Sequence, residues 1–139
     1  MIVLDTNVLS ELMRAAPEVA VADWVGGQAA ANLFITTITQ AEILHGVLLL
    51  PRGRRRNAIE AAANAMFEED FAGRILPFGS YAAQAYAEIA VARRQAGRPI
   101  SQFDAQIAAI AKSTGAGVAT RNVADFDECG VKVIDPWQS

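Results

Sequence analysis

Short apolar segments alternate with helical patterns along the chain. Between the short segments, apolar residues recur three or four positions apart, which is the spacing of one face of a helix. This alternation predicts an α/β fold with a mostly parallel sheet, because a helix must carry the chain back over the sheet before the next parallel strand begins. We expect strands at 2–4, 33–36, 75–77, 117–120 and 131–134, and helices at 8–13, 17–26, 39–50, 54–71, 80–96 and 101–114.

The length of 139 residues fits one domain, which we expect to span residues 1–139. The segment 75–77 ends in Pro77, which lacks the backbone N–H of a sheet ladder, and this favours an edge position. Apolar residues make up 53% of the chain, somewhat above the usual range of about 45–50%. In a small domain this surplus favours a second buried surface, most simply the interface of a homodimer.

The apolar stretches are too short to cross a membrane. The best of them does not reach the roughly 18 residues required, because His45, Gly46 and Pro51 interrupt it. The first residues lack the charged region that opens a signal peptide. Cys129 is the only cysteine, so no intramolecular disulfide framework is possible, and we expect a cytoplasmic protein. Cys129 itself is expected to be a small structural side chain near the last strand.

The net charge of −3 and the pI of about 5.1 argue against a protein that coats nucleic acid by bulk charge. They leave room for a local basic patch beside an acidic site. The arginine run at 52–56 is the main candidate, and a solvated turn between two helices is the competing interpretation. Other candidates are Arg93, Arg94, Arg98 and Arg121.

Four acidic residues stand at the expected carboxyl ends of strands or in the first turns of helices: Asp5, Glu42, Asp104 and Asp125. In an open parallel sheet, ligands bind in the crevice beyond the carboxyl ends of the strands, so acids placed there face one functional edge. Two carboxylates 4 Å apart repel each other by roughly 4 kcal/mol at an effective dielectric constant near 20. A bound divalent cation is the usual reason for such a cluster, and the pattern predicts a metal-dependent phosphodiesterase.

Helix capping is a competing explanation for three of these acids. Thr39 and Glu42 have the spacing of a capping box, in which the Glu side chain reaches back to the first amide of the helix. Asp104 and Asp125 would each stabilise a positive helix end by about 0.3–1 kcal/mol. The two interpretations are compatible, because helices that follow strands begin at the same sheet edge. Asp5 is different, since the residues after it can cap the first helix.

An acidic cluster of this kind suits Mg²⁺, which takes oxygen ligands and keeps several waters. The cation offsets phosphate charge, lowers the pKa of its water and aligns an in-line displacement. Thr6, Asn7, Ser10 and Thr120 can hydrogen-bond the carboxylates or the metal waters and fix their orientation. Arg121 leaves a strand toward the same edge, where it either contacts a substrate phosphate or forms a surface salt bridge.

His45 is the only histidine of the chain. We expect it to be partly buried and hydrogen-bonded rather than a general base or a metal ligand. A zinc site with several histidines or a Ser-His-Asp triad is thereby excluded. The chain also lacks a P-loop and a dinucleotide-binding fingerprint.

The acids lie in four segments whose order is 2–7, 39–46, 104–109 and 119–126. Together these segments resemble the motifs of the PIN-domain family, and especially its VapC-type toxins of bacterial toxin–antitoxin pairs. The segments 71–78 and 135–137 are similar to the FitB branch in particular. The resemblance covers essentially the full chain and implies a three-layer α/β/α fold with a central, mostly parallel sheet of about five strands.

The resemblance also implies a Mg²⁺- or Mn²⁺-dependent endoribonuclease in which Asp5, Glu42 and Asp104 are catalytic acids and metal ligands. Some relatives carry an Asp where this chain has Asn122, so either Asp125 or Asn122 completes the site. Residues expected to assist in holding the cofactor are Thr6, Thr120 and Asn122.

Partners are implied by the same resemblance. Relatives form homodimers, are inhibited by a small VapB/FitA-like antitoxin, and contact operator DNA only through that antitoxin. RNA is the expected substrate. The alternatives are a DNA or structure-specific nuclease, and a catalytically weak module that acts mainly in an antitoxin complex on operator DNA. A haloacid-dehalogenase-like phosphatase is disfavoured, because Asn7 stands where that chemistry needs a second Asp.

Overall fold

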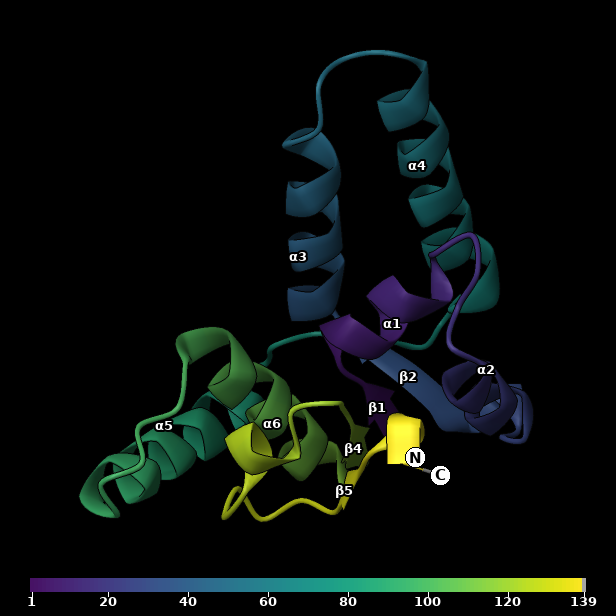
Figure 1. Ribbon diagram of the computed structural model, residues 1–139. Helices are drawn as coiled ribbons and strands as arrows, with labels where there is room; N and C mark the ends of the chain where they lie inside the picture. Colours follow the sequence, from purple (N-terminus) through teal and green to yellow (C-terminus); the bar gives the residue numbers. More distant parts are fainter. Residues whose placement is uncertain (139) are drawn as a thin grey trace.

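The computed structural model describes residues 1–138 and is shown in Figure 1. Ser139, the last residue of the predicted domain, lies outside the described residues. Five strands form one sheet in the order β3-β2-β1-β4-β5, and each pairing is parallel. They are β1 (Ile2–Leu4), β2 (Leu33–Thr36), β3 (Ile75–Leu76), β4 (Gly117–Ala119) and β5 (Val133–Ile134). The predicted strands are confirmed, with β3 at one edge.

The α-helices of residues 1–138 are α1 (Thr6–Leu12), α2 (Val19–Gly26), α3 (Thr37–Leu48), α4 (Arg54–Ala65), α5 (Ser80–Gln95) and α6 (Gln102–Thr114). Short 3₁₀ turns occur at Ala30–Asn32, Val123–Phe126 and Pro136–Gln138. None of the helices in this range is both long and apolar enough to pass through a bilayer.

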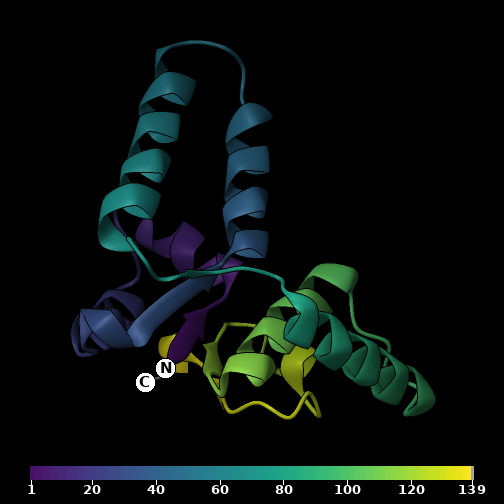
Figure 2. The ribbon, with the colours of Figure 1, turned by 180° about the vertical axis from the view of Figure 1, so that it is seen from behind.

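The alternation of side chains along the strands creates two separate cores. Val3 and Val118 face a cluster that includes apolar residues of α5 and α6. Leu4 and Ile35 point to the opposite face and pack against α1, α2 and α4. Figures 1 and 2 show α5 and α6 side by side, away from α1 and α2. The molecule therefore has helices on both faces of a parallel sheet, which confirms the predicted three-layer α/β/α fold.

Helix α3 begins two positions earlier than predicted, because Thr36 rather than Thr39 is its N-cap. The Thr36 hydroxyl oxygen accepts a hydrogen bond of 3.1 Å from the Thr39 backbone N–H. Glu42 thus lies beyond the first turn of α3, and the predicted capping box at this position is wrong. Helices α3 and α4 form an antiparallel hairpin that projects away from the sheet (Figures 1 and 2).

Two further expectations, one for α4 and one for α3, are corrected by the structure. The predicted helix 54–71 ends its α-helical part at Ala65 and continues as a π-helical turn, Met66–Asp70, in which Phe67 is buried, as is Phe71 directly after it. His45 is exposed, and its side chain has no hydrogen bond within residues 1–138. It lines a hollow between α3 and the start of α6, opposite Phe103, and the expectation of a partly buried, hydrogen-bonded histidine is wrong.

Candidate active site

A polar pocket opens where strands β1 and β4 end. Asp5 follows β1 directly and Thr120 follows β4 directly, so the parallel pairing of these strands brings the two residues to one edge of the sheet. Helices α3 and α6 bring Glu42 and Asp104 to the same place. The pocket has a volume of about 560 Å³ and is lined by Asp5, Thr6, Asn7, Ser10, Glu11, Arg14, Glu42, Asp104, Arg121, Asn122 and Trp137.

Asp5 is buried, with 4% of its surface exposed, and is held by three hydrogen bonds. One carboxylate oxygen accepts from the Thr6 backbone N–H at 2.8 Å. The other accepts from the Thr120 hydroxyl at 2.7 Å and from the Asn7 side-chain amide at 3.3 Å. Asp5 is also the N-cap of α1, because its extended backbone directs the carboxylate back over the first amide. The expectation that a later residue caps this helix is therefore corrected.

The acids of the pocket are costly to ionise together. Burial raises the pKa of Asp5 from its ordinary value of 3.8 to about 6, the hydrogen bonds from Thr120 and Thr6 oppose this rise, and the charges of Asp104 and Glu42 add to it. Burial also raises the pKa of Asp104. Carboxylates with raised pKa values in a polar pocket are typical of a site that binds a cation or transfers a proton.

Glu42 is oriented by a side chain of another helix. The Thr6 hydroxyl of α1 donates a hydrogen bond of 2.7 Å to Glu42 Oε1, and the same hydroxyl lies 2.9 Å from the Thr39 hydroxyl. Thr39 is completely buried, so this contact fixes the start of α1 against α3. The consequence is that Glu42 and Asp5 are linked through one residue, Thr6.

Asp104 combines the two roles that its sequence position allows. Ser101 is the N-cap of α6, and its hydroxyl accepts a hydrogen bond of 3.2 Å from the Asp104 backbone N–H. The predicted capping arrangement is confirmed at this helix. The Asp104 side chain nevertheless lines the pocket, because α6 starts at the edge of the sheet where β1 ends.

Thr120 connects the loop after β4 to Asp5. While its hydroxyl donates to Asp5, its oxygen accepts from the Asn122 backbone N–H at 3.0 Å and from the Asn7 side chain at 3.3 Å. The Arg121 backbone N–H donates to the Asn7 side-chain oxygen at 3.2 Å. Thr120 is fully buried, so these bonds hold the loop and Asp5 in one rigid arrangement.

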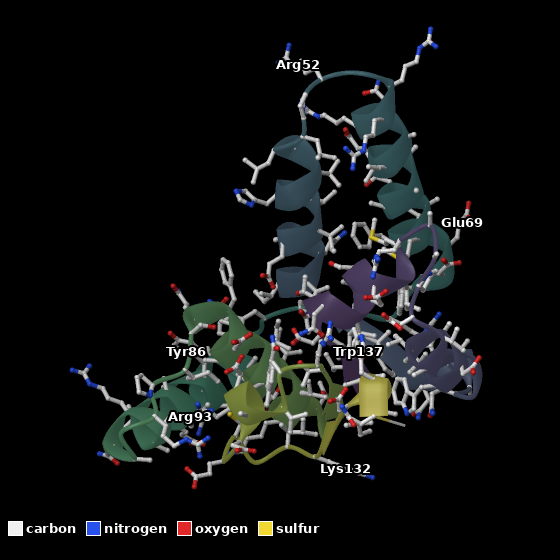
Figure 3. All side chains as sticks on the ribbon, in the orientation of Figure 1. Arg52, Glu69, Tyr86, Arg93, Lys132 and Trp137 are labelled. Carbon is white, nitrogen blue, oxygen red and sulfur yellow. The ribbon has the colours of Figure 1, made fainter. Side chains whose placement is uncertain are left out.

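Trp137 is a pocket residue that the sequence analysis did not identify. Its ring lies under the Arg121 guanidinium, with 5.1 Å between the guanidinium carbon and the ring centroid. Figure 3 shows Trp137 below α1, where the C-terminal segment returns to the sheet. Stacking on an aromatic ring restricts the guanidinium and keeps its charge beside the acids. The sequence carried no signal for this pairing other than the resemblance of the segment 135–137.

Glu11 and Arg14 also line the pocket without having been predicted there. Glu11 has 7% of its surface exposed and accepts from Arg14 Nη1 at 3.0 Å and from the Glu18 backbone N–H at 3.1 Å. The three-residue spacing of the acid and the arginine on a helix was the available signal. The hydrogen bonds of Glu11 are directed to Arg14 and to the residue before α2, so they give this acid a structural role.

Asp125 lies outside the pocket, in the exposed turn Val123–Phe126. Its backbone oxygen accepts a hydrogen bond of 2.8 Å from Arg93, a buried arginine of α5. The Asp125 charge still contributes to the raised pKa of Asp104. Asn122, in contrast, lines the pocket itself. Cys129 is buried beside the same turn, and burial raises the pKa of its thiol.

The residues of the pocket fit a hard divalent cation better than a transition metal. In residues 1–138, no group of three or more Asp, Glu, His or Cys side chains is placed so that it could hold a metal ion. Mg²⁺ does not need three protein ligands, because it retains several waters and is bound through one or two carboxylates. The oxygen-only acids Asp5, Glu42 and Asp104 around an open pocket meet that requirement.

Comparison with known proteins gives relatives that extend over the whole chain. Residues 2–131 match the PIN domain. The plasmid stability protein StbB of Pseudomonas syringae pv. tomato is 41% identical over 139 residues, which is 100% of both chains. The VapC ribonuclease Y4jK of Sinorhizobium fredii and the toxin FitB of Neisseria gonorrhoeae are each 38% identical, over 99% of both chains.

Solved structures show the same fold. A chain in the crystal structure of FitAcB from Neisseria gonorrhoeae superimposes with a TM-score of 0.94 at 37% identity, over 100% of both chains. A chain in the structure of FitAB bound to an IR36 DNA fragment gives a TM-score of 0.93 at 38% identity, over 99% of this chain and 96% of that chain. The protein therefore belongs to the PIN-domain family, in the FitB-like branch of its VapC-type members.

Proposed function

We propose that this protein is the toxin of a toxin–antitoxin pair and that it is a metal-dependent endoribonuclease, which hydrolyses phosphodiester bonds of RNA. The observation that carries the proposal is the convergence of Asp5, Glu42 and Asp104, from three distant segments, on one pocket. Relatives of the same length, named VapC ribonuclease and toxin FitB, support the reaction class and the role.

The hydrogen bonds leave the proposed ligands with free acceptor sites. A carboxylate offers about four lone-pair sites, and Asp5 uses three of them for Thr6, Asn7 and Thr120. Glu42 accepts from Thr6 through Oε1, while Oε2 has no hydrogen-bond partner among the described residues. Asp5 and Glu42 are thus each held in one orientation with an acceptor site available to the pocket.

Mg²⁺, with Mn²⁺ as a substitute, is the proposed cofactor, held by Asp5, Glu42 and Asp104 and from the rim by Asp125 or Asn122. When bound, it would supply charge neutralisation on the phosphate and a water of lowered pKa. Thr6 and Thr120 would keep two of the acids fixed while the substrate binds. Arg121, restricted by Trp137, would pair with a phosphate oxygen of the RNA.

The proposed regulatory partner is a small VapB/FitA-like antitoxin. The solved neighbours support it, since they are the complexes FitAcB and FitAB, the latter bound to DNA. We propose that operator DNA is contacted only through the antitoxin, in agreement with the net charge of −3 of this chain.

A homodimer is the proposed assembly. Large apolar side chains are exposed on α3 and at the start of α6, with exposed fractions of 55% for Leu48, 72% for Leu49, which directly follows α3, and 53% for Phe103. Pairing with a second copy would remove this surface from water. Sedimentation velocity of the purified protein would test the assembly, and a monomer at micromolar concentration would contradict it.

The decisive experiment compares RNA and DNA of one sequence as substrates, each with Mg²⁺ and with excess EDTA. We expect cleavage of RNA in Mg²⁺, no cleavage in EDTA, and loss of cleavage in Asp5→Asn, with the cut ends mapped on total cellular RNA. An exposed-site variant, Lys132→Gln, is the control. Cleavage that persists in EDTA would contradict metal dependence, and cleavage of DNA in preference to RNA would favour the alternative nuclease.

A further inference from the structure

Four arginines lie at the tip of the α3–α4 hairpin, at the end farthest from the sheet (Figures 1 and 2). Arg52 belongs to the connecting loop, and Figure 3 shows it at the top of the hairpin, directed away from the body. Arg54, Arg55 and Arg56 form the first turn of α4. These four residues are a third of the 12 Lys and Arg residues of the chain. We call them the arginine tip.

The fold does not account for this concentration of charge. None of the four guanidinium groups forms a salt bridge or a side-chain hydrogen bond with another residue in the range 1–138. Three of them stand at the positive end of α4, where each cation costs about 0.3–1 kcal/mol. The residue before them is Gly53, which has no side chain to cap the helix. An anionic partner would offset both the mutual repulsion and the unfavourable helix end.

Three hollows that share lining residues lie between the acidic pocket and the arginine tip. The acidic pocket shares Thr6, Ser10 and Glu42 with a groove of about 250 Å³ that runs along α3. That groove shares Leu50 with a hollow of about 230 Å³ at the tip, lined by residues 50–56. Along the helix axis, Glu42 and Leu48 are separated by about 9 Å, at 1.5 Å per residue. A single extended strand can therefore reach both places.

The negative charge of the chain favours a second contact region for a polyanion, away from the acidic pocket. Without the arginine tip, the formal net charge of −3 would fall to −7, and the acids of the pocket repel a polyanion. Arginine instead attracts a polyanion, because its guanidinium binds phosphate oxygens in a bidentate way.

We propose that the arginine tip binds the sugar-phosphate backbone of the RNA substrate beyond the cleaved bond, while the groove along α3 guides the strand to the acidic pocket. The inference rests on the proposed ribonuclease function. It adds a contact region that lies outside the pocket and sets the affinity for long substrates.

The test measures binding of a single-stranded RNA of about 16 nucleotides, a length at the upper end of single-strand site sizes. All proteins carry Asp5→Asn so that the RNA stays intact, and fluorescence anisotropy is recorded over a series of salt concentrations. The tip variant is Arg54→Gln with Arg55→Gln. Its matched control is Arg94→Gln with Lys132→Gln, which changes the net charge equally at two exposed, unpaired positions among the described residues.

We expect the tip variant to bind RNA on the order of tenfold more weakly at low salt. Its salt slope should be lower by about 0.7 for each RNA phosphate that the missing guanidinium groups no longer neutralise. The control should bind like the parent. The charge-preserving variant, Arg54→Lys with Arg55→Lys, should recover most of the salt slope. Circular dichroism confirms that the hairpin remains folded in each protein.

Equal affinity and equal salt slope in the tip variant and the control would overturn the inference and leave an acidic protein surface as the occupant of the tip. Failure of the proposed function is a separate result. It would appear as RNA that stays uncut by the parent chain with its native Asp5 in Mg²⁺, whatever the binding measurements give.

Discussion

The Thr120 hydroxyl donates a hydrogen bond of 2.7 Å to Asp5, although 115 positions separate the two residues in the chain. The bond exists because β1 and β4 are parallel neighbours, with Leu4 opposite Ala119. Each strand thus delivers its next residue to the same edge of the sheet. The N-terminal segment and the segment after β4 are thereby joined at the candidate active site.

Replacing Thr120 with Val removes this hydroxyl while preserving the shape of the side chain. We expect a loss of about 1–3 kcal/mol in the free energy of unfolding, because Asp5 loses a donor and the Asn122 N–H loses its acceptor in a buried place. RNA cleavage should fall as well, since Asp5 is less firmly oriented. Urea unfolding and cleavage rates would measure both effects. Thr120→Ser keeps the hydroxyl and should retain most of the stability, and an equal loss in both variants would contradict the role of the bond.

The stability of the metal-free protein should depend on pH through Asp5. Its pKa rises from 3.8 to about 6 on folding, so the folded chain holds this proton more tightly than the unfolded chain. This difference in pKa contributes roughly 3 kcal/mol to the free energy of unfolding. The contribution is fully present below about pH 4 and is lost as the pH rises through about 6. The pKa of Asp104 is also raised, so it too makes the free energy of unfolding fall as the pH rises. Chemical unfolding of the parent and of Asp5→Asn at pH 4 to 7 would isolate the Asp5 part as the difference, and a difference that does not vary with pH would contradict it.

Arg93 should be a strong determinant of stability. It has 4% of its surface exposed, and its guanidinium donates to the backbone oxygens of Asp125, Asp127 and Arg98 at 2.8, 2.9 and 2.7 Å. Arg93→Met keeps the length of the side chain but removes the donor from these partly buried hydrogen bonds, and we expect a loss of about 3 kcal/mol. Arg94→Met changes the adjacent exposed arginine and should stay within about 0.5 kcal/mol of the parent. Similar unfolding midpoints for the two variants would refute this expectation.

Arg121 should act on substrate binding more than on folding. Its side chain is exposed and stacked on Trp137, so Arg121→Gln should change the free energy of unfolding by less than about 1 kcal/mol. The KM for RNA should rise several-fold, because the variant has no charge to pair with a phosphate oxygen. Trp137→Leu should reproduce part of this rise by releasing the guanidinium. Unchanged KM values in both variants would exclude Arg121 from substrate binding.

The fold was predictable because its signals are local. Each strand is a short apolar segment, each helix has its own periodicity, and some helices also have a start signal, as with Ser101 before α6. The error at Glu42 has a physical cause: Thr36 and Thr39 are equally good caps by sequence, and only the end of β2 decides that Thr36 takes the role. Glu42 was then free to pair with Thr6, which no local pattern could reveal.

The acids of the candidate site could be predicted from the sequence, but the contacts that surround them could not. Asp5, Glu42 and Asp104 could be placed at one edge, since parallel strands end together. Trp137 and Arg93 could not be placed, because their contacts depend on how the C-terminal segment and α5 pack in three dimensions. The position of Asp125 outside the pocket is likewise set by the turn that Arg93 holds.

The order of strands has a consequence for biosynthesis. β1 is translated first but lies at the centre of the sheet, and one of its two neighbours, β4, ends only at Ala119. Asp5 cannot acquire its Thr120 partner until nearly the whole polypeptide has left the ribosome. A nascent or prematurely terminated chain thus lacks the assembled acidic pocket, which forms only when synthesis is almost complete.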